Sequence, residues 1–225
     1  MMGIIFLTAW KIASPKVAVL SLLGMFGIAI MNLWDPTMVT LAIMFVSVFI
    51  SVLIGVPLGV IAARSNLVDS WLKPILDTMQ TMPSFVYLVP GIMFFGLGNV
   101  SAILATVLYA LPPCIRLTNL GIRQVDPAVI EAGKSFGSSN MQLLFKIQIP
   151  MAIPTIMAGI NQTVMMALAM STICAMVGAG GLGIEVLRAM GQLREGEAVI
   201  AGFAIVILAI IIDRITQGYI AQRQS

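Results

Sequence analysis

The sequence has no histidine, only two cysteines, and few charged residues, which make up 9% of its 225 residues. The lack of histidine and the apolar surroundings of Cys114 and Cys174 argue against a metal site or a structural disulfide. There is no GxxxxGK[ST] loop, so we expect this chain to bind no ATP and no other cofactor. The net charge of +3 is too small to indicate a nucleic-acid partner.

What the sequence does contain is apolar residues, at 60% of the chain with a mean hydropathy of +1.05. A soluble domain carries about 25% charged residues, so we expect a membrane protein. A spanning helix needs about 20 mostly apolar residues. We predict one all-α domain over residues 1–225, a polytopic membrane bundle of about six spans. The predicted spans are residues 17–34, 37–63, 80–97, 100–115, 156–178 and 198–213.

The positions of Lys and Arg predict the orientation, because basic residues stay on the cytoplasmic side of a membrane. With the N-terminus inside, ten basic residues face the cytoplasm and only Arg188 and Arg194 face outward. Both termini are then cytoplasmic, and residues 116–155 form the largest cytoplasmic loop. The ten residues expected inside are Lys11, Lys16, Arg64, Lys73, Arg116, Arg123, Lys134, Lys146, Arg214 and Arg223.

Two segments between the spans allow more than one interpretation. In residues 64–77, Asp69, Lys73 and Asp77 are spaced to share one helical face, which favours a solvated amphipathic connector. Span 80–97 contains two prolines and is either a broken helix beside a pathway or a helix kinked for packing. The GAGGLG run at residues 178–183 is expected to form a flexible turn.

The loop at residues 126–155 is predicted to contain two short helices. Asp126 is placed to cap the first helix, and Gly137 to end it in a left-handed conformation. Ser139 and Gln142 have the spacing of a capping box that begins the second helix, and Pro150 is expected to close it.

Apolar residues in this water-facing loop have two explanations. An exposed apolar patch rimmed by charge is typical of a protein docking site. Alternatively, the same side chains are covered by the membrane spans. The residues concerned are Phe136, Met141, Leu143, Leu144 and Phe145.

The loop resembles the signature of the membrane subunits of ABC importers, which reads E-A-A, three residues, G, nine residues and I-x-L-P. Here it reads Glu131-Ala132-Gly133, then Gly137, then Ile147-Gln148-Ile149-Pro150. Gly133 stands where the family usually has alanine, and Ile149 where it has leucine. A glycine within a helix costs up to about 1 kcal/mol relative to alanine, so we expect a slightly softer loop. By this resemblance the coupling residues are Glu131, Ala132, Gly133, Gly137, Ile147 and Pro150.

Residues 79–99, 110–137, 145–163 and 178–193 narrow the resemblance to the permeases of glycine betaine/proline-type osmoprotectant importers. It implies a type I ABC importer permease fold in the plasma (inner) membrane of a prokaryote. It also implies a permease homodimer, two cytoplasmic ATPase subunits that bind ATP and Mg, and an extracytoplasmic substrate-binding protein. The loop would dock on the ATPase as a coupling helix. The chain itself would not be an enzyme.

Polar and methionine residues on span 156–178 are candidates to line the solute path. Methionine is flexible enough to seal a narrow pore, but it also fills gaps between packed helices, and both interpretations stay open. The candidates are Asn161, Gln162, Thr163, Met165, Met166 and Met170.

Two other functions are weaker alternatives. One is an ABC permease for another small solute, such as an amino acid. The other is a secondary transporter, which is disfavoured because no ionisable residue lies at the centre of a predicted span.

Overall fold

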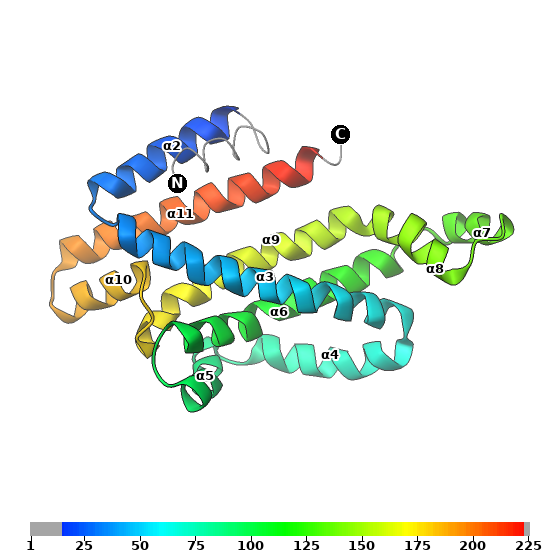
Figure 1. Cartoon of the computed structure of the whole chain (residues 1–225), viewed down its shortest axis with the longest axis horizontal. Coiled ribbons are helices and arrows are strands. Elements are labelled where there is room, and N and C mark those ends of the chain that lie inside the picture. The colour runs from blue at the N-terminus through cyan, green and yellow to red at the C-terminus, as the bar shows by residue number, and fades with distance from the viewer. Residues whose placement is uncertain (1–14, 223–225) are drawn as a thin grey trace.

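In the computed structural model, which describes residues 15–222, the chain is a bundle of helices aligned along one long axis (Figure 1). Helices are the only regular elements in this range, so the all-α prediction is confirmed. Lys11 and Arg223, used above for orientation, lie outside the described residues. The first half of the chain forms α2 (Pro15–Ile30), α3 (Trp34–Arg64), α4 (Asn66–Thr81), η1 (Ser84–Tyr87), α5 (Leu88–Phe95) and α6 (Asn99–Arg123).

The second half begins with a hairpin and continues as long helices. The hairpin consists of α7 and α8, and a π-helical turn, η2, joins α8 to α9. The elements are α7 (Pro127–Ser135), α8 (Asn140–Leu143), η2 (Leu144–Gln148), α9 (Ile149–Ile173), η3 (Cys174–Val177), α10 (Leu182–Gly191) and α11 (Glu195–Gln222).

Within the described residues, four helices are long and apolar enough to cross a membrane, and two shorter apolar segments accompany them, which is roughly consistent with the prediction of about six spans. α4, η1 and α5 follow one another in sequence between α3 and α6, with a break between α4 and η1 (Figure 1). The long segments are Trp34–Arg64, Asn99–Arg123, Asn140–Val177 and Glu195–Gly218, and the short ones are Val17–Ile30 and Ser84–Phe95.

α6 lies at the centre of the bundle and makes its most extensive contacts with α3 and α9. Small residues allow this approach: a Cβ added to Gly59 on α3 would lie 2.6 Å from the Cβ of Thr118. Helix α6 continues beyond the predicted end of span four near residue 115, through Pro112 and Pro113, to Arg123. Both prolines are fully buried, so the neighbouring helices hold the segment helical.

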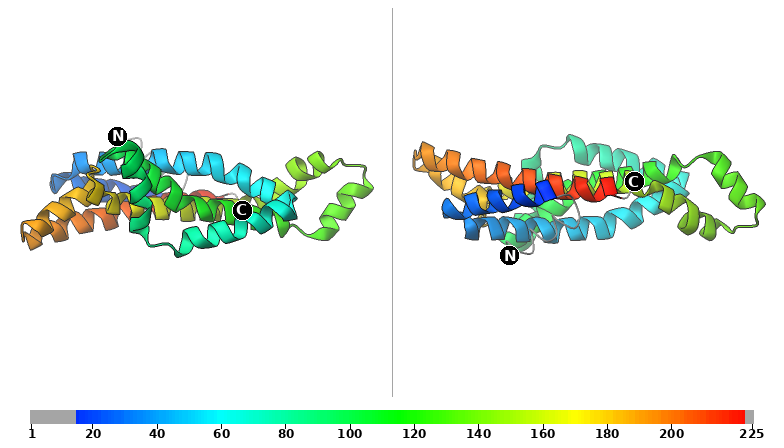
Figure 2. Two further views of the ribbon diagram at one scale, coloured as in Figure 1. Left: turned by 90° about the horizontal axis from the view of Figure 1, so that it is seen from below. Right: turned by 90° about the horizontal axis from the view of Figure 1, so that it is seen from above.

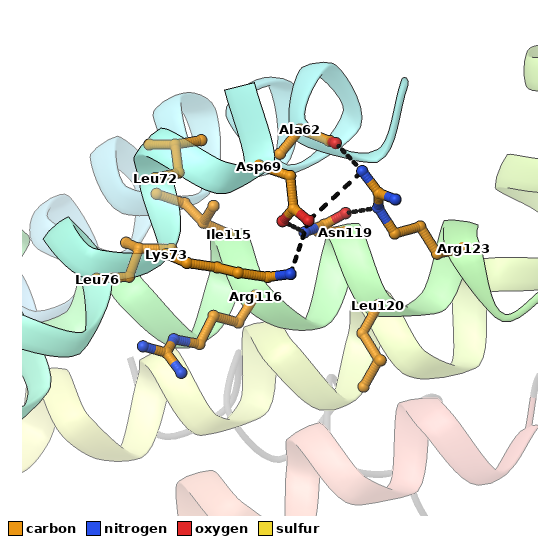
Figure 3. A pocket seen from close by; sticks show the side chains of 10 residues that line it. All are labelled: Ala62, Asp69, Leu72, Lys73, Leu76, Ile115, Arg116, Asn119, Leu120 and Arg123. Carbon is orange, nitrogen blue, oxygen red and sulfur yellow. Dashed lines mark hydrogen bonds and ion pairs between the residues drawn. The ribbon is translucent and has the colours of Figure 1, made fainter. Parts of the chain in front are cut away.

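The expected connector at residues 64–77 is the amphipathic helix α4, but its charged face is not simply solvated. Asp69 on this face is only 6% exposed and lies against α6 (Figure 3). Leu67 and Trp71, in contrast, are exposed on the outside of α4. α4 thus turns Asp69 and Leu76 toward the bundle and Leu67 and Trp71 outward, and it lies outside the apolar segments given above.

Candidate coupling loop and translocation face

The α7–α8 hairpin projects beyond the other helices at one end of the bundle (Figures 1 and 2). Asp126 caps α7 by accepting a hydrogen bond from the Ala128 amide at 2.8 Å. Gly137 has φ +78° and ends the helix, and the next amide, of Ser138, bonds to the Gly133 carbonyl at 3.1 Å. The predicted cap and the left-handed glycine are therefore confirmed.

α8 begins with the predicted capping box. The Ser139 amide donates to Oε1 of Gln142 at 2.8 Å, and the Gln142 amide donates to Oγ of Ser139 at 3.4 Å. The expectation that Pro150 closes this helix is wrong, since α8, η2 and α9 follow without interruption. In the π-helical turn the amide of Ile149 bonds to the carbonyl of Leu144. Pro150 therefore sits in the first turn of α9, where a missing N–H is tolerated.

Gly133 is buried where α7 packs on the following segment. A Cβ added to it would lie 2.7 Å from Cδ2 of Leu143 and 2.8 Å from Cδ1 of Ile147. The absence of a side chain at Gly133 thus lets α7 lie close to α8 and η2. This packing effect is separate from the softer loop expected from the sequence. Glu131 and Ala132, the other signature residues of α7, are exposed on the same helix.

The apolar residues of the hairpin divide between the two explanations. Leu143 and Leu144 are buried beneath it, as expected of packing. Phe136, Met141 and Phe145 are 90%, 56% and 58% exposed, and we call these three the apolar tip. Met141 contacts Arg64 of α3 through its Sδ, but most of the surface of all three side chains is uncovered in the described part of the chain, so a partner could dock on them.

The six candidate path residues on α9 do not share one face. Thr163 and Met170 are fully buried, and Met166 packs against the core, so in this conformation these three side chains face the interior of the chain. Asn161 accepts a hydrogen bond from Oγ1 of Thr216 on α11 at 2.5 Å. Successive helical residues point about 100° apart, which is why neighbours in sequence diverge here.

One side of α9 nevertheless remains open in the isolated chain. Gln162 is exposed and Met165 is half-buried, so both remain candidates to line a path. Two exposed alanines, Ala158 and Ala169, and the half-buried Thr172 lie on the same side. We call these five residues the open α9 face.

The GAGGLG run is closely packed rather than the flexible turn expected. Gly181 has φ +107°, which only glycine adopts readily. The amide of Leu182 donates to Oγ1 of Thr40 on α3 at 2.8 Å. A Cβ added to Gly183 would lie 2.3 Å from the carbonyl oxygen of Thr172. This turn therefore fixes α10 against α3 and the end of α9.

A polar cluster between α4 and α6 was missed by sequence reasoning. Asp69 accepts hydrogen bonds from Lys73 Nζ at 2.8 Å and from Asn119 Nδ2 at 2.7 Å, beside a cavity of about 290 Å³ (Figure 3). The hydrogen bond from Lys73 holds the pKa of Asp69 below its usual value, although burial opposes this. About two turns further along α4 from Asp69, Asp77 pairs with Arg116. The spacing of the acidic residues was the available signal, but it did not identify α6 as their partner.

Residues 55–225 match the family described as the binding-protein-dependent transport system inner membrane component. The chain is 50% identical over 212 residues to the glycine betaine/proline betaine transport system permease protein ProW of Escherichia coli, covering 94% of this chain and 60% of that relative. It is also 50% identical over 217 residues to the glycine betaine transport system permease protein OpuAB of Bacillus subtilis, covering 96% and 77%. The chain thus spans well under two thirds of the length of ProW.

Among solved structures, an inward-facing conformation of the MetNI methionine ABC transporter has a TM-score of 0.77 at 24% identity, covering 85% of this chain and 95% of that one. An amino acid ABC transporter has a TM-score of 0.71 at 20% identity, covering 84% and 92%. These likenesses establish the fold, that of a type I ABC importer permease. With the family match over residues 55–225, they show that the chain belongs to the binding-protein-dependent transport system inner membrane components.

Proposed function

We propose that the chain is the transmembrane permease subunit of an ATP-driven ABC importer for glycine betaine/proline-type compatible solutes. In this proposal two copies of the chain form the permease in a prokaryotic inner membrane. Two ATPase subunits bind ATP and Mg and dock from the cytoplasm, and a substrate-binding protein delivers the solute from outside. This chain would supply the path and the coupling loop, and no catalysis.

The observation that carries the proposal is the apolar tip at the end of the projecting hairpin. Phe136 is 90% exposed, whereas many other apolar side chains of the described residues are buried. Lys134 and Lys146 lie close to the tip in sequence and are exposed. An apolar centre with a charged rim is what a protein partner recognises. We assign the tip to the groove of an ATPase.

The proposed orientation places the hairpin and both termini in the cytoplasm. α2 runs away from the end that carries α7 and α8, and α11 runs back toward it (Figure 1). The basic residues Arg64, Arg123 and Lys134 gather at this same end, around a cavity of about 240 Å³. Such a concentration of Lys and Arg is expected on the cytoplasmic side.

The open α9 face supports a path between two copies of the chain. Gln162 would present its amide to hydrocarbon if this side of α9 faced lipid, which is costly. By contrast, the exposed side of α3 carries large apolar residues such as Phe45 and Phe49. We therefore assign α3 to the lipid boundary and the open α9 face to the centre of a homodimer.

The proposed solute is a small zwitterion with a methylated nitrogen. Besides the two relatives above, a glycine betaine/carnitine transport permease protein, GbuB of Listeria monocytogenes, is 46% identical over 225 residues. An amino acid remains the alternative solute, but it is supported only by structures that share the fold at low identity.

ATP binding would close the two ATPase subunits and move the hairpins with them. The helices would then turn from an inward-open to an outward-open arrangement, and hydrolysis would reset them. The test is uptake of radiolabelled glycine betaine by proteoliposomes that contain the permease, its ATPase and its binding protein. We expect ATP-dependent uptake that excess carnitine reduces and excess methionine does not. Uptake of methionine in place of glycine betaine would contradict the proposed solute class.

A further inference from the structure

Arg123, the last residue of α6, joins three helices immediately before the chain enters the coupling hairpin. Its Nη2 donates to the carbonyl oxygen of Ala62 on α3 at 2.8 Å. Its Nη1 donates to Oδ1 of Asn66 on α4 at 2.8 Å. Its Nε donates to Oδ1 of Asn119 on α6 at 2.9 Å (Figure 3). One guanidinium therefore bonds to the end of α3, the start of α4 and its own helix.

The same guanidinium faces the buried carboxylate of Asp69. Nη2 of Arg123 lies 3.6 Å from Oδ2 of Asp69, which also accepts from Lys73, while Oδ1 of Asp69 accepts from Asn119. A buried carboxylate is tolerated only with several such partners, and removing one leaves the rest unbalanced. The cluster therefore resists separation of α4 from α6.

A second contact ties this helix junction to the hairpin. Nη1 of Arg64, the last residue of α3, lies 3.0 Å from Sδ of Met141 on α8. Only Gln124, Val125 and Asp126 separate Arg123 from α7. A displacement of the hairpin thus reaches the ends of α3, α4 and α6 through Arg123 and its neighbours.

We propose that Arg123 is a positioning residue that transmits movement of the coupling hairpin to α3 and α4. The inference rests on the proposed function, because it concerns how ATP hydrolysis is linked to movement of the path. The planar guanidinium is suited to this role, since its five donors are held in a fixed fork. An ammonium group in the same place could face Asp69 but could not bond to Ala62, Asn66 and Asn119 together.

The test compares two arginines on α6. Arg116 faces the same helix, α4, but among residues 15–222 its ion-pair partner is Asp77 alone, and this pair is solvent-exposed. Arg123→Gln and Arg116→Gln would each be prepared in the complete complex and assayed for ATP hydrolysed per solute transported. We expect the ratio to rise about tenfold for Arg123→Gln, the size of effect seen for residues that carry coupling. We expect it to stay within about twofold of wild type for Arg116→Gln.

The variant Arg123→Lys distinguishes a role of Arg123 in transmitting hairpin movement from a role in folding. It keeps a positive charge beside Asp69, so we expect normal assembly with the ATPase and a ratio raised about threefold, between wild type and Arg123→Gln. The proposal is overturned if Arg123→Gln assembles and retains the wild-type ratio. It is also overturned if Arg123→Gln is lost from the membrane while Arg123→Lys couples normally, because the residue then serves only folding. A wild-type complex that hydrolyses ATP without any uptake would contradict the proposed function itself, and the inference with it.

Discussion

Gly183 at the start of α10 lies against the backbone of Thr172 near the end of α9, so closely that an added Cβ would come within 2.3 Å of the Thr172 carbonyl oxygen. Gly183→Ala should therefore force the backbone apart and destabilise the chain by about 1–3 kcal/mol. The measurement is the thermal unfolding midpoint of the detergent-solubilised protein. Gly191→Ala is the control, because a Cβ there meets nothing within 4 Å. Equal midpoints for both variants would show that the contact is not tight.

Gly137→Trp should uncouple the hairpin without preventing membrane insertion. The φ of +78° at this position costs a side-chain-bearing residue about 1–2 kcal/mol, and the indole would extend from the docking end. We expect normal amounts in the membrane but no stimulation of ATP hydrolysis by the solute-loaded binding protein. Gly137→Asn is the control, since asparagine tolerates this conformation. Full stimulation in Gly137→Trp would remove Gly137 from the docking surface.

Phe136→Glu should weaken binding of the ATPase while leaving the permease as stable as wild type. Phe136 is 90% exposed, so the change disturbs no packing within the chain, but it places a charge at the centre of the apolar tip. Loss of a central aromatic anchor costs about 2 kcal/mol or more of binding free energy. Co-purification of the ATPase at graded concentrations measures the effect.

Leu193→Glu is the matched control for the apolar tip. Leu193 is 86% exposed in the turn between α10 and α11, at the opposite end of the bundle from the hairpin (Figure 1). We expect it to leave ATPase binding unchanged. If the two variants lost the ATPase equally, the tip would have no special part in docking.

Gln162→Leu should slow uptake without reducing stability, because Gln162 is exposed on the open α9 face. Loss of one hydrogen bond to a passing solute or to its water corresponds to about 1 kcal/mol, or roughly fivefold in rate. Met170→Leu, at a buried position on the same helix, should leave uptake unaffected. The measurement is the initial uptake rate in proteoliposomes. Slower uptake by Gln162→Leu but not by Met170→Leu would assign the solute path to the open α9 face rather than to the buried side of α9.

Gly133→Ala should change stability little, because two opposing effects are of similar size. Alanine favours the helix by up to about 1 kcal/mol, whereas its Cβ would press on the ends of the Leu143 and Ile147 side chains. Those ends are flexible and can shift by a fraction of an ångström. Gly133→Val should lower the unfolding midpoint, since its two methyl groups have no such relief. A stable valine variant would contradict the packing of α7 on η2.

The parts of the hairpin that sequence predicted correctly depend on signals only a few residues apart. The cap at Asp126, the left-handed Gly137 and the capping box of Ser139 and Gln142 are each decided by local hydrogen bonds. The course of the chain after Pro150 is not local. It depends on a π-helical turn that moves the hydrogen bonds of the preceding residues before the proline is reached.

Tertiary arrangement explains the other failures. The spacing of Asp69 and Lys73 defines a helical face but not the neighbour that this face meets, so the contact with Asn119 could not be anticipated. Thr163 and Met170 became path candidates by residue type alone, which does not indicate that both side chains are buried in this conformation. From the sequence, the glycines of GAGGLG indicate a flexible backbone. In the fold, their lack of a side chain permits close contact with neighbouring helices.

The chain is helical without interruption from Asn140 to Val177, so α8 of the hairpin and the far end of the bundle belong to one continuous helical segment. A helical segment of 38 residues is about 57 Å long. Pro154, which has no N–H to donate, lies inside α9 near one end of this segment. If the segment tilts as one body about that end, the displacement grows with distance along it and is largest near Val177. The turn that follows Val177 is bonded to α3 through the Leu182 amide and Thr40, so such a tilt would also displace the contact between α10 and α3.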